Sequence, residues 1–508
     1  MLSNEWKHFK SGTDIRGVAL DGAEGAVDLT DEAVQRMAGG FLQWLCGKTG
    51  KEPNALSLAV GRDSRLSGPR IRDAVVQALT AAGASVLDCG LASTPAMFMT
   101  TIDLGCDGSV QITASHHPYH RNGLKFFTKN GGVESHDIEA ILAFAQEGTP
   151  LAAKSVGKCR VSDYMTAYAA RLRRLICDGL GETEADRPLR GFHIVVDAGN
   201  GAGGFYANDV LQPLGADIAG SQFLEPDGRF PNHIPNPENE EAMASVCAAT
   251  VKAGADLGVI FDTDVDRAGC VDSQGREINR NRLVALAAAI ALESCPGGTI
   301  VTDSITSSGL KAFIEQNLGG KHRRFKRGYK NVINESLRLN EKGIPSPLAI
   351  ETSGHAALQD NYFLDDGAYL VTRIIIKMAQ LHREGKSLDS LIARLREPAE
   401  SVELRFHITA ADFRPYGEQV IEALEEYARS QGWPVADDSC EGVRLSFGKT
   451  DGNGWLLLRL SVHDPVMPLN IESDEAGGCQ KIAAHLAAFL SGWEGLDTHS
   501  LTEYVKGQ

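Results

Sequence analysis

One local pattern occurs three times along the chain and limits the folds available to it. An apolar run typical of a buried strand is followed each time by an aspartate, a Gly- or Ser-rich loop and a helical segment. The aspartates are Asp63, Asp197 and Asp303. Because the intervals between them have the size of a domain, the repeats predict three α/β domains of similar design. The competing interpretation is one large doubly wound sheet.

The chain changes character after the third repeat. Strand-like runs lie at 402–406, 443–447 and 455–460, and amphipathic helical segments lie near 418–430 and 475–491. This grouping predicts a small α+β domain, joined through a linker at 394–401. A length of 508 residues suits several domains. We expect four, at 1–157, 158–280, 281–396 and 397–508.

Composition restricts the partners and the compartment. The formal net charge is −16, so the surface as a whole should attract neither nucleic acid nor an anionic membrane. No apolar run reaches the ~18 residues needed to span a bilayer, and the first residues lack the apolar core of a signal peptide. Ten cysteines without C-x-x-C spacing are typical of free thiols. We expect a cytoplasmic protein, monomeric or homodimeric.

The stretch 113–125 places a hydroxyl and a cation on a predicted hairpin. Ser115 follows an apolar run, and Lys125 opens a second one. The dipeptide Asn122-Gly123 between them favours a tight turn. Such a hairpin brings a nucleophilic oxygen and an ammonium group together, which suits phosphoryl transfer. The simpler alternative is a polar loop in which Ser115 only hydrogen-bonds to backbone.

An acidic loop follows another buried-strand pattern and carries Asp262, Asp264 and Asp266 at alternate positions. Clustered carboxylates repel one another unless a cation lies between them, and Arg267 alone does not offset that repulsion. Oxygen ligands of this kind predict a Mg²⁺ site. An EF-hand is excluded because its sixth position would be Arg267 and its twelfth Ser273. The alternatives are a solvated acidic turn and the strand-D-x-D nucleophile of an aspartyl-phosphate enzyme.

Two later loops carry groups that suit a phosphorylated sugar. Glu351 and Ser353, beside a glycine and a histidine, supply an acid and a hydroxyl that can bind sugar hydroxyls, although a helix N-cap turn would use the same residue types. Arg459, Ser461 and His463 alternate after a strand-like run, so that their donors can converge on one phosphate.

Together these motifs resemble those of the α-D-phosphohexomutase superfamily, the phosphoglucomutase/phosphomannomutase group, over nearly the full chain. The family's active-serine motif, T-x-S-H-N-P followed by N-G-x-K, is matched by Thr113, Ser115, His116, Pro118, Asn122, Gly123 and Lys125. Its metal loop, D-x-D-x-D-R, is matched by Asp262, Asp264, Asp266 and Arg267. Its sugar loop, G-E-x-S-G-H, is matched by Glu351, Ser353, Gly354 and His355, and its D-I-R-G motif by residues 14–17.

The resemblance implies a fold and a reaction. Three similar α/β domains with mixed sheets, followed by a smaller α+β domain, would place the active site in a central cleft. Ser115 would carry a phosphate, and Mg²⁺ would bind Asp262, Asp264, Asp266 and an oxygen of that phosphate. The enzyme would interconvert hexose 1-phosphate and hexose 6-phosphate, of glucose or mannose, through a 1,6-bisphosphate. Glucose 1,6-bisphosphate, or the cognate hexose bisphosphate, would be the activator.

The same resemblance implies roles for the other residues. Lys125 is the expected general acid/base, with a lowered proton affinity, while Arg267 and Arg16 support the transferred phosphate and His116 orients Ser115. The expected substrate-binding residues are Glu351, Ser353, Arg459, Ser461, His463, Tyr329 and Lys330.

Some positions depart from the family pattern. The phosphate loop usually reads R-x-S-G-T-E-P, whereas Val462 and His463 stand here for Gly and Thr, and His117 replaces the Asn beside the serine. A β-branched residue restricts φ, and a protonated His463 would give the phosphate site a pH dependence. Thr352, between the sugar-binding residues, indicates neither a hexose nor an amino sugar. The alternatives are therefore a phosphoglucosamine mutase and a non-catalytic sensor of sugar bisphosphates.

Overall fold

The computed structural model describes residues 2–22, 25–149, 153, 155–461 and 464–507. The chain forms two compact units. Unit 1 comprises Met1–Ile290 and Ser353–Leu391, and unit 2 comprises Ala291–Thr352 and Ile392–Gln508. Among the described helices, none is long and apolar enough to cross a membrane.

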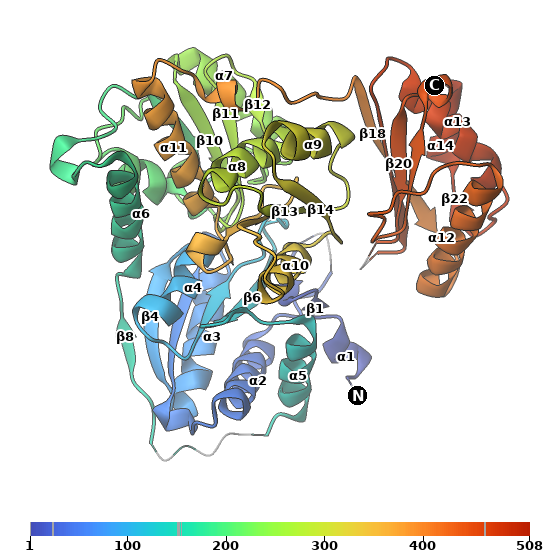
Figure 1. Ribbon diagram of the computed structural model, residues 1–508. Coiled ribbons are helices and arrows are strands. Elements are labelled where there is room, and N and C mark those ends of the chain that lie inside the picture. The colour runs from blue at the N-terminus through green and yellow to red at the C-terminus, as the bar shows by residue number, and fades with distance from the viewer. Residues whose placement is uncertain (1, 23–24, 150–152, 154, 462–463, 508) are drawn as a thin grey trace. The chain divides into compact units, whose positions relative to one another are not determined.

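The N-terminal part of unit 1 is built on a mixed sheet in the order β1-β2-β6-β5-β3-β4-β8, with β7 paired to β6 (Figure 1). Its strands are β1 (Lys10–Ser11), β2 (Asp14–Val18), β3 (Ser57–Arg62), β4 (Ser85–Leu91), β5 (Gly108–Ile112), β6 (Arg121–Thr128), β7 (Gly131–Gly132) and β8 (Cys159–Val161). The helices are α1 (Asn4–Lys7), α2 (Asp31–Thr49), η1 (Pro53–Ala55), α3 (Gly68–Ala81), α4 (Thr94–Asp103) and α5 (Ser135–Glu147).

Helix α2 illustrates why these residues form these elements. Thr30 Oγ1 accepts the N–H of Ala33 and caps the start of the helix, and Gly50, with φ of 69°, ends it. The buried ring of Phe41 stacks on Phe126 of β6, with centroids 4.4 Å apart. The apolar face of α2 is thereby buried on the sheet.

A second mixed sheet of unit 1 has the order β12-β11-β10-β9, in which β9 and β10 are parallel and the other pairs antiparallel. Its strands are β9 (Ile194–Asp197), β10 (Leu257–Phe261), β11 (Ala268–Asp272) and β12 (Glu277–Ile278). Its helices are α6 (Tyr164–Leu180), η2 (Glu184–Asp186), the π-helix η3 (Tyr206–Leu211), α7 (Glu240–Ala253) and α8 (Arg280–Ser294), which crosses into unit 2. Unit 1 also contains β16 (Ala356–Leu358), η5 (Gln359–Asn361), β17 (Leu364–Asp365), α11 (Gly367–Arg383) and η6 (Leu388–Leu391).

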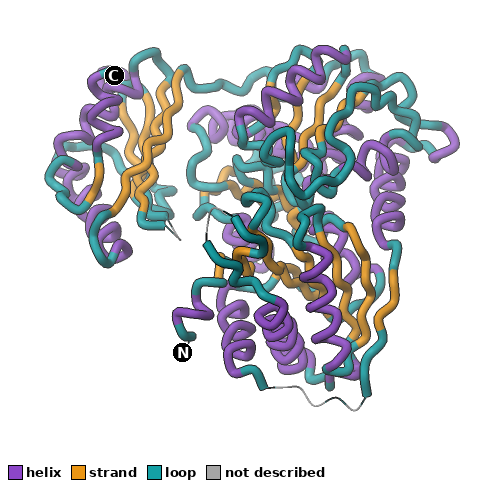
Figure 2. Tube along the Cα trace, turned by 180° about the vertical axis from the view of Figure 1, so that it is seen from behind, coloured by secondary structure: helices purple, strands orange, loops and turns teal. Residues whose placement is uncertain are grey.

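Unit 2 begins with three parallel strands, β13 (Thr299–Thr302), β14 (Lys321–Arg324) and β15 (Leu348–Ile350), with α9 (Ser308–Ala312), the π-helix η4 (Phe313–Asn317) and α10 (Tyr329–Glu341). The C-terminal sheet of unit 2 is antiparallel, in the order β19-β20-β21-β18-β22. Its elements are β18 (Glu400–Ile408), α12 (Phe413–Ser430), β19 (Val443–Phe447), η7 (Lys449–Asp451), β20 (Gly454–Leu458), β21 (Val466–Ser473), α13 (Gly478–Leu490), β22 (Leu496–Asp497) and α14 (His499–Lys506). Helices α12–α14 cover one face of this sheet, as both views show (Figures 1 and 2).

The predicted fold class, three α/β domains with mixed sheets and a smaller C-terminal sheet domain, is confirmed. The described strands form separate sheets rather than one doubly wound sheet. Asp63 follows β3, Asp197 ends β9 and Asp303 follows β13, as the repeated pattern indicated.

Strand β21 was not predicted from the sequence, because Pro468 within it argues against a strand. Strand β8 pairs with β4 and so extends the first sheet beyond residue 157, while the domain boundaries stay predictions.

The turn expected at Asn122-Gly123 is wrong. Both residues lie inside β6, opposite Gly17 and Arg16 of β2. A glycine is required at 123 because a Cβ there would lie 2.1 Å from the carbonyl oxygen of Ile15. The dipeptide therefore marks a close approach of two strands rather than a reversal of the chain.

Candidate active site

Ser115 lies on the loop that leaves β5, and its backbone φ is 49°. A non-glycine residue in this left-handed region carries a cost of about 1 kcal/mol or more, which indicates a constrained position. The N–H of Ser115 donates to Thr113 Oγ1 at 2.8 Å, and Ser115 Oγ donates to Asp262 Oδ2 at 3.1 Å. Ser115 is 7% exposed. Its hydroxyl is thus held, nearly buried, against the acidic loop.

The acidic loop after β10 brings three buried carboxylates together. Oxygens of Asp262, Asp264 and Asp266 lie within 4.8 Å of one another. Val265, between two of them, has φ of 68°, which is rare for a β-branched residue. Among the described residues, neither Asp264 Oδ1 nor Asp266 Oδ1 has a hydrogen-bond partner, although both are buried. Such oxygens fit a divalent cation of the Mg²⁺ type.

Lys125 lies in β6 opposite Gln111 of β5, and its side chain reaches the acidic loop. Lys125 Nζ donates to Asp264 Oδ2 at 3.0 Å and also to Asp266 Oδ2. Burial acts to lower the pKa of Lys125, but the charges of Asp264 and Asp266 outweigh it and raise that pKa well above its usual value. The expected lowering of its proton affinity is therefore wrong for this arrangement. Lys125 is therefore a second cation beside the carboxylates, in addition to Arg267.

His116 connects Arg267 to the serine. His116 Nδ1 lies 2.7 Å from Arg267 Nη2 and 3.3 Å from Ser115 Oγ. Because a guanidinium only donates, Nδ1 accepts, and the proton of the neutral ring is on Nε2. Although His116 is an exposed residue, desolvation of its ring and then the positive charge of Arg267 lower the pKa of His116 below its usual value. A neutral ring that accepts from Arg267 suits an orienting role for His116.

Arg16 supports the chain just before the serine. Its Nη2 donates to Asp14 Oδ2 at 2.6 Å, and its Nη1 donates to the carbonyl oxygen of Thr113. The guanidinium is buried, with Arg16 6% exposed. Arg16 is thus placed to hold the start of the serine loop.

His355, in the sugar motif, also belongs to unit 1. It forms a β-bridge with Arg267, and its Nδ1 hydrogen-bonds to Asp365 Oδ2. Burial acts to lower the pKa of His355, but Asp365 and Asp266 raise it above its usual value. The neighbouring carboxylates therefore favour the protonated form of His355. Ser353 of the same motif is buried in this unit.

Glu351, Tyr329 and Lys330 lie in unit 2. Tyr329 begins α10, and Gly328 before it has φ of 106°, a conformation that requires glycine. The N–H of Gly328 donates to Glu351 Oε1 at 2.6 Å. This bond places the acid of the sugar motif beside the start of α10, where Tyr329 and Lys330 follow.

Arg459 follows β20 and is 8% exposed. Burial, and then the positive charge of Arg327, lower the pKa of Arg459. Its Nη1 lies 3.9 Å from Glu441 Oε1, and among the described residues its Nε has no hydrogen-bond partner. The Nε of this nearly buried guanidinium is therefore an available donor for an anion.

The rest of the predicted phosphate loop is described only in part. Ser461 Oγ accepts the N–H of Asp464 at 3.3 Å, so the hydroxyl takes part in the turn. Val462 and His463 lie outside the described residues.

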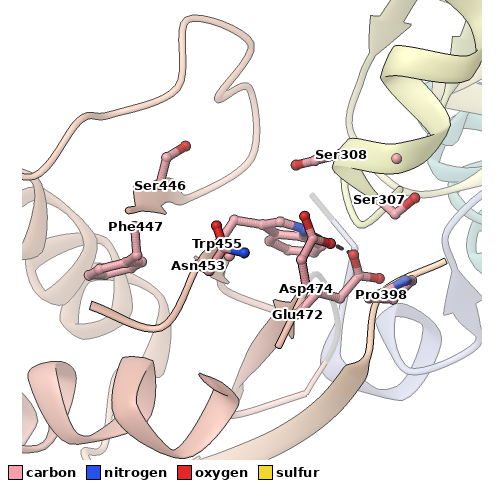
Figure 3. A pocket seen from close by; sticks show the side chains of 11 residues that line it. Ser307, Ser308, Pro398, Ser446, Phe447, Asn453, Trp455, Glu472 and Asp474 are labelled. Atoms are coloured by element: carbon pink, nitrogen blue, oxygen red, sulfur yellow. Dashed lines mark hydrogen bonds between the residues drawn. The ribbon is translucent and has the colours of Figure 1, made fainter. Parts of the chain in front are cut away.

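A pocket elsewhere in unit 2 contains none of the predicted site residues. Figure 3 shows Ser307 and Ser308, at the start of α9, across from Trp455, Glu472 and Asp474 of the C-terminal domain. Trp455 Nε1 donates to Glu472 Oε2 at 2.9 Å, and burial raises the pKa of Glu472 to about 7.

Sequence reasoning missed two residues that support the site. Thr94 Oγ1 donates to Asp264 Oδ2, and the Thr94 N–H donates to the Asp264 carbonyl at 2.8 Å. Arg65 donates to several carbonyls of the serine loop. The available signals were the Ser-Thr-Pro start of α4 and the Gly-Arg-Asp-Ser-Arg turn after β3, but neither identifies a partner distant in sequence.

Comparisons with known proteins identify the family of this chain. Models of phosphoglucomutase/phosphomannomutase α/β/α domains I, II and III match residues 9–150, 167–275 and 279–398. The phosphomannomutase/phosphoglucomutase of Pseudomonas putida is 31% identical over 427 residues, which cover 84% of this chain and 85% of that protein.

Solved structures share the fold. A phosphoglucomutase/phosphomannomutase family protein from Burkholderia thailandensis has a TM-score of 0.77 at 26% identity, covering 97% of this chain and 98% of that one. The N-acetylphosphoglucosamine mutase of Aspergillus fumigatus, solved with GlcNAc-6P and magnesium, has a TM-score of 0.51 at 15% identity, covering 85% and 77%. This chain therefore belongs to the phosphoglucomutase/phosphomannomutase family and is a hexose phosphate mutase, an intramolecular phosphotransferase.

Proposed function

We propose that this chain interconverts the 1- and 6-phosphates of glucose or mannose through a phosphoserine at Ser115 and a 1,6-bisphosphate intermediate. The observation that carries the proposal is the contact of Ser115 Oγ with Asp262 Oδ2, beside Asp264, Asp266 and Lys125. A nucleophilic oxygen next to a cation site and an ammonium group is the arrangement that phosphoryl transfer needs.

Mg²⁺ is the proposed metal. Asp262, Asp264 and Asp266, with a phosphate oxygen on Ser115, would hold it, and the buried unpaired oxygens of Asp264 and Asp266 support this assignment. When bound, the ion supplies a positive charge that draws electron density from the phosphorus. A magnesium complex of the related Aspergillus enzyme is consistent with that choice.

The chain's own residues account for the proton transfers. A free sugar hydroxyl attacks the phosphorus, a new P–O bond to the sugar forms, and the P–O bond to Ser115 breaks. Lys125, which holds a proton in this arrangement, donates it to the departing Ser115 oxygen and then accepts the proton of the sugar hydroxyl. The bisphosphate turns over in the site, and the reverse steps return its other phosphate to Ser115. His116 orients Ser115, and Arg267 and Arg16 stabilise the transferred group.

The substrate-binding residues are proposed from the family motifs that they match. Arg459 and Ser461, with His463 from the undescribed part of the loop, bind the phosphate that does not react. Tyr329 and Lys330 at the start of α10 add donors.

Glu351 and Ser353 bind the ring hydroxyls in the same proposal. Thr352 between them donates its hydroxyl to Asp303 Oδ2 at 2.7 Å, so this hydroxyl is engaged within the protein.

Phosphorus NMR of the purified protein tests the proposal directly. The protein is incubated with Mg²⁺, a trace of glucose 1,6-bisphosphate, and glucose, mannose or glucosamine 1-phosphate in separate tubes. We expect a 6-phosphate signal for glucose or mannose, and phosphate on the Ser115 peptide by mass spectrometry. A signal with glucosamine alone would favour the phosphoglucosamine mutase, whereas phosphorylated Ser115 without turnover in any tube would favour the sensor.

Two further proposals concern the cellular compartment and the oligomeric state. All ten cysteines are free thiols in the structure, which supports a reducing compartment and hence a cytoplasmic location. We propose a monomer or homodimer, which analytical ultracentrifugation distinguishes.

A further inference from the structure

The turn after β3 buries an arginine completely. Arg65 is 0% exposed. Its N–H donates to Asp63 Oδ1 at 2.9 Å, and its Nε lies 3.3 Å from Asp63 Oδ2. A guanidinium removed from water needs both a counter-charge and acceptors for its N–H groups. Asp63 supplies the charge, and the acceptors come from the serine loop.

The guanidinium donates to four carbonyl oxygens of that loop. Nη1 donates to Pro118 at 2.7 Å and Arg121 at 2.9 Å, and Nη2 donates to His117 at 2.6 Å and to Ser115 itself. Arginine presents these donors in one rigid plane, which a lysine ammonium does not reproduce. The loop is therefore wrapped around a single group that also holds the carbonyl of Ser115.

Arg65 is fixed from a second direction by the domain that carries the acidic loop. The ring of Phe230 lies 5.3 Å from the guanidinium carbon. Gly228 is packed against the same turn, since a Cβ there would lie 2.5 Å from both Ser64 O and Leu66 N. The turn that carries Arg65 has no room to shift on this side.

We propose that Arg65 is a positioning residue for phosphoryl transfer: by binding the carbonyls of loop 115–121, it holds Ser115 in its left-handed conformation with Oγ facing Asp262. The proposal rests on the proposed function, in which Ser115 carries the phosphate. Without these bonds the unfavourable φ of Ser115 would relax toward an ordinary value. That relaxation would displace Oγ from the acidic loop while leaving the substrate-binding residues of unit 2 unchanged.

Arg65→Lys is the test variant, and Arg36→Lys is its matched control. Arg36 also donates to two carbonyls, those of Ala145 at 2.8 Å and Gln146 at 2.6 Å, and lies 4.9 Å from the ring of Trp6. Both acceptors belong to α5 rather than to the serine loop. Each substitution keeps the positive charge and removes the planar fork, so the pair separates a general packing defect from an effect on Ser115.

We expect Arg65→Lys to lower kcat about 10- to 100-fold, because a misplacement of about 1 Å at a reacting atom costs about 100-fold. KM should change by less than about twofold, because the lost contacts do not bind substrate. Phosphorylation of Ser115 by glucose 1,6-bisphosphate should slow by a similar factor, and amide hydrogen exchange should accelerate in peptides covering 113–121. Arg36→Lys should leave kcat and this exchange within about twofold of wild type, even with a lower melting temperature.

Equal kcat and equal exchange in the two variants would overturn the role of Arg65. Absence of phosphate on wild-type Ser115 would instead refute the proposed function, and the exchange comparison would still decide whether Arg65 fixes the loop. If Arg65→Lys does not fold, Asp63→Asn carries the test, since it leaves the guanidinium but removes its counter-charge. Faster exchange at 113–121 with a lower kcat supports the proposal, and no change in either contradicts it.

Discussion

Replacing Lys125 by methionine should destabilise the protein without Mg²⁺, and Mg²⁺ should reverse much of that loss. Lys125 Nζ lies 3.0 Å from Asp264 Oδ2 and also contacts Asp266, and all three residues are buried. At 3 Å and an effective dielectric constant of about 20, one such pair has a Coulomb attraction of about 5 kcal/mol. Removing one partner of a buried pair costs about 3–5 kcal/mol, because the carboxylates stay buried without their cation. We expect the free energy of unfolding to fall by about that amount.

Mg²⁺ offers the same carboxylates another cation, so Lys125→Met should gain more stability from it than wild type does. Thermal melts of both proteins, with and without excess Mg²⁺, measure this difference. Lys51→Met is the control, because half-exposed Lys51 pairs with Asp107 away from the acidic loop and should lose about 1 kcal/mol or less, with no added Mg²⁺ response. Turnover of Lys125→Met should fall more than about tenfold if Lys125 transfers the proton. The same Mg²⁺ shift in wild type and Lys125→Met would refute the idea that Lys125 and Mg²⁺ share these carboxylates.

Ser115→Ala should give no 6-phosphate signal in phosphorus NMR and no phosphate on the 113–125 peptide, because it removes the oxygen that carries the phosphoryl group; residual turnover would place the nucleophile elsewhere. Asp264→Asn should weaken Mg²⁺ binding at least about tenfold in titration calorimetry, because a carboxylate charge leaves the site; unchanged affinity would exclude Asp264 as a ligand. Desolvation and the charge of Arg267 lower the pKa of His116 in the folded protein, while an unfolded imidazole titrates near pH ~6.5, so the stability contributed by the neutral ring is present above that pH and is lost as the pH falls below it. His116→Gln should therefore weaken the fall in unfolding free energy, measured by urea unfolding, between about pH 7 and 4. An unchanged pH dependence would contradict a neutral His116 ring.

The fold and the main loops could be predicted from sequence because each is marked locally. A buried strand followed by an aspartate and a Gly- or Ser-rich loop appears in the chain as a continuous pattern, and Asp63, Asp197 and Asp303 do end or follow strands. The carboxylates of the acidic loop are likewise only two positions apart. Local spacing was therefore enough to identify the candidate nucleophile and the candidate metal ligands.

The remaining features depend on contacts between distant parts of the chain. Lys125 and Asp264 are 139 residues apart, and only the fold places their charges together. Arg65 donates to backbone carbonyl oxygens. Because every residue has such an oxygen, the acceptors of Arg65 cannot be identified from the sequence. Glycine is favoured both in tight turns and where two backbones approach closely. The sequence pattern at Gly123 therefore predicts a turn, whereas the structure has a close strand contact there.

Charge balance links the proposed phosphoserine to the proposed metal. Asp264 and Asp266 share the ammonium of Lys125, whereas Asp262 accepts the hydroxyl of Ser115. Burial, and then the charges of Asp266 and Asp264, raise the pKa of Asp262 well above its usual range, although Arg267 Nε lies 3.5 Å from Asp262 Oδ2. A phosphate on Ser115 adds a charge of about −2 at this same point. That added negative charge favours binding of a cation, and this is the physical reason that phosphorylation of Ser115 and binding of Mg²⁺ should depend on each other.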